Sequence, residues 1–211
     1  MKSRTASRKI IIGWLVIIIV ISTITIANAD RVMGKFTTGN VSYFIVAGPI
    51  SNSAHSELVA LIKQWDDQTT GITMSSGSSS NARLKIRYCL EAPMQSGLLG
   101  QTTVYSADGT QVRFEGSWDK AECIVFNESA ANETNRKATL VHEVGHALSL
   151  DHPRLLVNKS IMRQGLKDFT TITAYDKSEI KAIWGQEDEI QNCDYISYVN
   201  NFVALWLPCE K

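Results

Sequence analysis

The chain has 211 residues, of which 44% are hydrophobic and 20% are charged. This composition supports one globular domain with an apolar core, and two domains would be a tight fit. The 21 lysine and arginine residues balance 21 aspartate and glutamate residues, so the formal net charge is zero and no basic field exists to attract nucleic acid. A nucleic-acid partner is therefore not expected.

The first thirty residues are typical of a targeting segment. A basic start at residues 2–9 precedes an uncharged, mostly apolar run from Ile10 to Ala29. The tripeptide Ala-Asn-Ala at 27–29 is a small-x-small cleavage site, which predicts a signal peptide over residues 1–29. The same run is long enough to span a bilayer, so an uncleaved N-terminal membrane anchor is the alternative. In both cases the positive end stays in the cytoplasm and the rest of the chain is exported.

Export changes how the four cysteines are interpreted. Cys89, Cys123, Cys193 and Cys209 all follow the leader, in a compartment where disulfides persist, and three pairings are possible. We expect Cys89 to pair with Cys123 and Cys193 with Cys209, with free buried thiols as the alternative. No C-x-x-C pair occurs, which argues against a cysteine zinc site.

The pattern of apolar residues beyond the leader predicts alternating strands and helices. Residues 40–50 are rich in β-branched and aromatic side chains and indicate a strand. Residues 53–71 have helical periodicity, with Ser53 as a possible N-cap and Gly71 as a stop. The later elements are a loop at 75–81, a strand at 83–90, short strands at 102–106, 111–116 and 122–129, and a helix at 135–150. This order predicts an α+β domain with a mixed sheet.

The last of these helices carries the chemistry. His142 and His146 are four residues apart, so they lie on one helical face, where both imidazoles can bind the same metal ion. Glu143 is displaced by about 100° around the helix and can reach a water on that metal without ligating it. Neutral nitrogen ligands beside a carboxylate base are what a zinc hydrolase requires.

A third ligand must come from outside this helix. His152 is the candidate, but a continuous helix would place it about 600° beyond His146, roughly on the opposite side. The helix must therefore end between these two residues and turn back.

The segment "HEVGHALSLDH", residues 142–152, resembles the H-E-x-x-H-x-x-G-x-x-H signature of the metzincin zinc endopeptidases. It matches every functional position except the glycine, where this chain has Ser149. If Ser149 adopts the left-handed conformation that glycine takes cheaply, the strain costs about 1–2 kcal/mol.

Two later segments extend the resemblance. Met162, within "SIMRQG" at 160–165, resembles the methionine of the clan's Met-turn, which lies beneath the metal. Residues 173–185 are similar to the C-terminal helix that closes the domain of matrixin-type members. Gln164 stands where the astacin group has an additional tyrosine ligand, so that ligand is missing.

The resemblance implies a metzincin-like catalytic domain over residues 40–185, with a mixed, mostly parallel twisted sheet, an active-site helix, a Met-turn and a C-terminal helix. It implies one catalytic Zn²⁺ held by His142, His146 and His152, with Glu143 as general base. Calcium is left open, because no motif supports it. Residues 186–211 are expected to form a C-terminal extension closed by a disulfide.

The predicted function is zinc-dependent hydrolysis of peptide bonds in extracytoplasmic proteins. The partners are a protein or peptide substrate and, if the leader is uncleaved, a membrane; the chain is expected to be a monomer. The segment at 97–106 is the candidate edge strand for substrate, and the loop at 163–172 should wall the pocket for the residue after the cut, where Leu166 and Phe169 suggest an apolar preference. The alternative is a catalytically weak or inactive zinc-binding envelope or recognition module.

Overall fold

The computed structural model describes residues 34–153 and 159–185. They form an α+β domain, as the sequence predicts. Its elements, in chain order, are β1 (Asn40–Ala47), α2 (Asn52–Lys63), the 3₁₀ turn η1 (Asp66–Gln68), β2 (Thr73–Ser76), β3 (Leu84–Tyr88), β4 (Gly100–Tyr105), β5 (Gln111–Val112), β6 (Lys120–Val125), α3 (Glu133–Ala147) and α4 (Ala174–Trp184).

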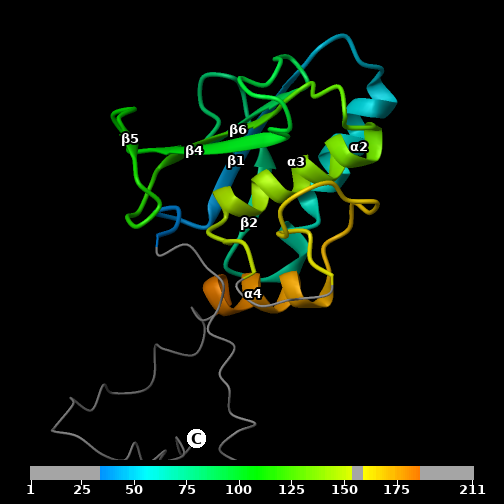
Figure 1. Ribbon diagram of the computed structural model, residues 1–211. Coiled ribbons are helices and arrows are strands. Elements are labelled where there is room, and N and C mark those ends of the chain that lie inside the picture. Colours follow the sequence, from blue (N-terminus) through cyan, green and yellow to red (C-terminus); the bar gives the residue numbers. More distant parts are fainter. Residues whose placement is uncertain (1–33, 154–158, 186–211) are drawn as a thin grey trace, which may run out of the picture. The chain divides into compact units, whose positions relative to one another are not determined.

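The strands form one six-stranded sheet in the order β2-β1-β3-β6-β4-β5 (Figure 1). Strands β2, β1, β3 and β6 pair in parallel, whereas β4 pairs antiparallel with both β6 and β5. The predicted mixed, mostly parallel sheet is thus confirmed. Strand β1 shows the alternation expected of a half-buried strand, because Val41, Tyr43 and Ile45 are buried while their neighbours are more exposed.

Helix α3 runs along one face of the sheet, against β4 and β6, and α2 lies beside it (Figure 1). Two buried tryptophans fix α3 to its neighbours. Trp65, just after α2, donates its indole N–H to the carbonyl oxygen of Val141 at 3.1 Å. Trp184, at the end of α4, donates to the carbonyl oxygen of Leu148 at 3.0 Å. The helix that carries the predicted ligands is therefore held by the sheet, by Trp65 after α2 and by Trp184 of α4.

The boundaries of α2 differ from those predicted. Its N-cap is Ser51, whose hydroxyl accepts a hydrogen bond from the backbone N–H of Ala54, so Ser53 is not the cap. The helix also ends at Lys63, well before Gly71. Trp65 is nevertheless fully buried, because the chain turns there and inserts its ring against α3. Burial of that ring accounts for the apolar periodicity beyond the true helix end.

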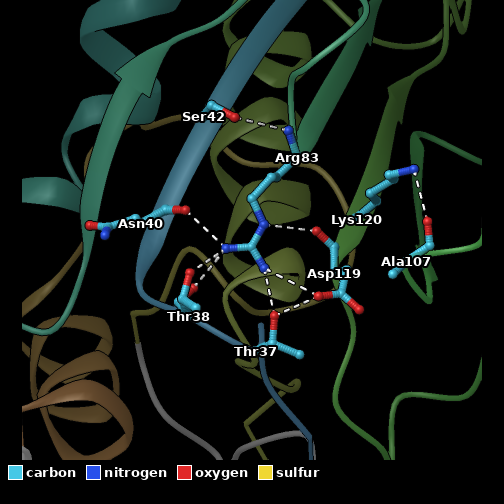
Figure 2. A network of polar contacts seen from close by, with 8 residues as sticks. All are labelled: Thr37, Thr38, Asn40, Ser42, Arg83, Ala107, Asp119 and Lys120. Atoms are coloured by element: carbon cyan, nitrogen blue, oxygen red, sulfur yellow. Dashed lines mark hydrogen bonds and ion pairs between the residues drawn. The ribbon is translucent and has the colours of Figure 1, made fainter.

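Arg83, just before β3, joins three segments of the chain (Figure 2). Its guanidinium donates to the carbonyl oxygens of Asp119, Thr38 and Asn40, and also to the hydroxyls of Thr37 and Thr38. The Thr37 hydroxyl in turn donates to the Asp119 carboxylate at 2.7 Å. These contacts hold three segments together: the segment that leads into β1, the start of β3 and the start of β6.

The predicted Cys89–Cys123 disulfide is wrong, because both thiols are free. The register pairs Cys123 with Ile86, three residues before Cys89. That offset separates the two cysteines by about 10 Å along the strands, whereas a disulfide needs Cα atoms within about 7 Å of each other. The predicted Cys193–Cys209 pair, like the C-terminal extension at 186–211, lies outside the described residues.

The predicted leader, residues 1–29, also lies outside the described residues. Within the part of the chain that the structure describes, no helix has the length and apolar character needed to cross a bilayer.

Candidate metal centre

The first two predicted ligands are positioned by α3. A capping box starts this helix: the Asn132 side chain accepts from the backbone N–H of Asn135, and the Asn135 side chain accepts from that of Asn132. The helix then continues without interruption to Ala147. His142 and His146 consequently lie one turn apart on the same face, with their Nε2 atoms 3.1 Å from each other.

Helix α3 ends at Ala147, and the chain then turns back toward His142 and His146. Ser149 has φ = 81°, in the left-handed region, so it adopts the conformation that glycine takes cheaply at this position of the signature. The backbone N–H of Leu150 then donates to the carbonyl oxygen of Gly145 at 3.0 Å, which turns the chain back. His152 is thereby brought to the face that carries His142 and His146.

Replacing Ser149 with glycine is expected to raise the free energy of unfolding by about 1 kcal/mol. Glycine adopts the left-handed conformation without strain, and the Ser149 hydroxyl is buried with no hydrogen-bond partner in the part of the chain that the structure describes. Urea unfolding measures the change. Ser149→Ala is the control, since it removes the hydroxyl and keeps the backbone strain. A glycine variant less stable than the alanine variant would contradict this account.

The three imidazoles form a nearly equilateral set of donors. His152 Nε2 lies 3.2 Å from both His142 Nε2 and His146 Nε2. A tetrahedral zinc ion with bonds of 2.0–2.1 Å requires nitrogen ligands about 3.3 Å apart, so this donor set fits zinc. In the described part of the chain, these histidines are the only group of three or more potential ligands of this kind. The fourth histidine, His55, is exposed on α2.

Backbone carbonyls fix the orientation of two of these rings. His142 Nδ1 lies 2.8 Å from the carbonyl oxygen of Ile161, and His146 Nδ1 lies 2.8 Å from that of Leu150. A carbonyl oxygen can only accept, so each Nδ1 carries the proton and each Nε2 lone pair is free for a metal. Gln164 approaches His152 Nδ1 through its side-chain amide at 3.3 Å. Gln164 is the residue that stands where the astacin group has its additional tyrosine ligand.

Burial sets the charge state of the ligands. It lowers the pKa of His146 to about 4, lowers the pKa of His142 well below its usual value, and also lowers the pKa of His152. All three imidazoles are therefore neutral at pH 7, which is the state that binds a metal ion.

Glu143 lies beside the histidines with its side chain buried. Burial raises the pKa of its carboxyl to about 7, while a hydrogen bond from Thr102 and the charge of Lys167 lower it. Thr102 Oγ1, on β4, lies 2.7 Å from Glu143 Oε2 and 2.9 Å from the Glu143 carbonyl oxygen. Gly100 makes room for this carboxylate, since a Cβ at that position would lie 2.6 Å from Glu143 Oε1. The sequence placed both β4 residues in the candidate edge segment at 97–106 but offered no signal for their contacts with Glu143.

The predicted Met-turn lies directly beneath α3. A Cβ added to Gly145 would lie only 2.4 Å from Met162 Sδ, so the methionine packs on the helix backbone between the two histidines. Asp176, in the first turn of α4, holds this turn in place. Its carboxylate accepts from the Ser160 hydroxyl at 2.5 Å and from the backbone N–H of Ile161 at 3.0 Å. Ile161 is also the partner of His142, so α4 is linked to the first ligand.

A cleft of about 730 Å³ opens over the three histidines and Glu143. Residues 97–102 line it on the side of β4, and Gln164, Gly165 and Lys167 line it after the Met-turn. Leu166 is 57% exposed and is not part of the lining, nor is Phe169. The apolar pocket expected from these two side chains is therefore not formed by them, because the loop turns Lys167 inward instead.

A helix with two imidazoles placed to bind a metal, a turn that returns a third imidazole and a methionine turn beneath them are the features of a metalloprotease of the metzincin type. The model of the matrixin family matches residues 35–185, so the chain belongs to the matrixin family and is a zinc metalloprotease, a hydrolase. The chain is also similar to the solved structure of myroilysin, with a TM-score of 0.45 and 13% identity, over 71% of this chain and 95% of that one. Among curated proteins, none matches.

Proposed function

We propose that the chain is a zinc endopeptidase of extracytoplasmic proteins, in which His142, His146 and His152 hold the ion and Glu143 is the general base. One observation carries this proposal: three Nε2 atoms converge at 3.1–3.2 Å on the floor of a cleft into which the Glu143 carboxylate also faces. A binding module would need the three ligands but not the buried carboxylate.

Zinc, when bound, supplies Lewis-acid chemistry, because it polarises a substrate carbonyl and makes water a stronger nucleophile at neutral pH. Glu143 takes the proton from the attacking water and later passes it to the leaving amine. Thr102 orients the carboxylate for both transfers through its 2.7 Å hydrogen bond. The backbone partners of His142 and His146 keep the ligand set rigid during the reaction.

The edge of β4 is the proposed substrate site. Strand β5 pairs only with Val104 and Tyr105, so among the described residues no strand pairs with the first part of β4, from Gly100 to Thr103, on the side away from β6. This free edge lines the cleft beside Glu143. An extended peptide can add to it as another strand through main-chain hydrogen bonds, which supports cleavage within a chain.

The proposed location follows from the leader. Residues 1–29 would direct the catalytic domain across a membrane and then be removed or remain as an anchor. The substrates would accordingly be exported proteins, and the enzyme would act as a monomer.

The test is zinc-dependent cleavage. Purified protein is incubated with a mixed pool of unfolded proteins, and new peptide ends are identified by mass spectrometry. We expect internal cuts that fall at least tenfold after removal of the metal with a chelator and return when zinc is added back. Stoichiometric zinc binding without any cut would instead support the recognition module.

A further inference from the structure

Lys167 is the one cationic side chain among the described residues that line the cleft. Its place is fixed, because its carbonyl oxygen accepts from the side-chain amide of Asn135, in the first turn of α3, at 2.6 Å. Its ammonium donates to the carbonyl oxygen of Gly165 at 3.1 Å. Within the described ranges, no carboxylate forms an ion pair with it.

The two carboxylates whose charges act on Lys167 already accept hydrogen bonds from other groups. Glu143 accepts from Thr102, and Asp176 accepts from Ser160, Ile161 and Thr173. The other acidic residues of the lining are Glu115, from the segment between β5 and β6, and Asp151. Asp151 accepts from the backbone N–H of His152. Lys167 thus lines the cleft with no carboxylate paired to its ammonium among the described residues.

The charge persists at neutral pH. Burial lowers the pKa of Lys167 to about 8, while Glu143 and Asp176 oppose this decrease. At pH 7 most of the amine is still protonated. A half-buried ammonium binds a carboxylate more strongly than an exposed lysine does, because less water screens the pair.

We propose that Lys167 selects substrates with aspartate or glutamate immediately after the cleaved bond. This inference rests on the proposed function. Lys167 and Glu143 line the same cleft, and Glu143 delivers its proton to the leaving amine. The residue that carries this amine therefore enters the cleft that Lys167 also lines, which brings its side chain toward the ammonium. The substrate class is a chain with an acidic residue at that position, rather than the apolar one that Leu166 and Phe169 suggest.

The test uses the purified full chain with zinc and peptides of one sequence that differ only after the cut, where glutamate, glutamine or leucine stands. We expect kcat/KM to be about tenfold higher for glutamate than for glutamine. Lys167→Met should reduce this ratio to about one, and Lys167→Arg should preserve a preference for glutamate. Lys177→Met, at an exposed position on α4, is the matched control and should keep the full ratio.

Two further arms separate the possible failures. If the parent protein cuts the glutamate and glutamine peptides equally, the inference is overturned while the endopeptidase stands. If zinc-loaded protein cuts no peptide and no unfolded protein, the proposed function itself fails. A peptide that ends one residue after the cut is compared as free acid and as amide. A preference for the acid alone, without a preference for internal glutamate, would overturn the selection of a side chain and assign Lys167 to a chain terminus.

Discussion

Replacing Glu143 with glutamine is expected to lower kcat/KM for a peptide substrate by about 10³-fold while zinc stays bound. The amide has nearly the shape of the carboxylate and its oxygen can still accept from Thr102, so the packing of β4 on α3 is preserved. It cannot take a proton from water at neutral pH. The loss should therefore appear in kcat, with KM and the zinc content almost unchanged.

The matched control is Glu115→Gln, which removes another carboxylate from the same cleft. It should change kcat/KM by less than about threefold, because Glu115 is exposed to solvent and lies between β5 and β6 rather than on the helix that carries His142 and His146. Steady-state kinetics and zinc analysis of the purified variants give both quantities. A Glu143→Gln variant that keeps a tenth of the parent rate would show that another group accepts the proton.

The parts of the site that could be predicted from sequence are local in the chain. Helical periodicity alone places His142 and His146 on one face, and the resemblance to the metzincin signature predicts the turn that returns His152. The spacing requires the chain to turn between His146 and His152, and the resemblance to the signature marks Ser149 as the position where the structure has the left-handed conformation. These features depend on backbone geometry within eleven residues.

The remaining parts depend on how distant segments meet. Thr102 reaches Glu143 because β4 pairs with β6 in one register, and no pattern in the sequence specifies that register. The predicted disulfide is wrong for the same reason, because the sequence does not specify the register of β3 and β6. In the actual register Ile86, and not Cys89, lies opposite Cys123. Lys167 enters the cleft and Leu166 does not because of how one loop turns, which composition does not determine.

Replacing Asp176 with alanine is expected to lower the free energy of unfolding by about 3–5 kcal/mol. The Asp176 side chain is fully buried and accepts hydrogen bonds from Ser160, from Ile161, and from both the backbone N–H and the hydroxyl of Thr173. Alanine leaves these donors without an acceptor and creates a cavity. Urea unfolding of zinc-loaded and zinc-free protein measures the loss. Asp176→Asn should cost less, because one acceptor oxygen remains.

The same substitution should weaken zinc binding by about 10–100-fold. Asp176 holds the backbone of Ile161, and the carbonyl oxygen of Ile161 orients His142. When this link is lost, the first ligand gains rotational freedom that zinc must remove on binding. Competition with a chelator of known affinity measures the change at a temperature where the variant is folded.

Two smaller substitutions separate the roles of Asp176. Ser160→Ala removes a contact on the Met-turn side, and Thr173→Ala removes the hydroxyl on the α4 side. Both should destabilise the fold by about 1–2 kcal/mol, since each deletes a hydrogen bond to a buried carboxylate. If Asp176 acts on the metal through the Met-turn, zinc affinity falls in the Ser160 variant and not in the Thr173 variant. Equal losses of zinc affinity would mean that Asp176 supports the site only through the general stability of the fold.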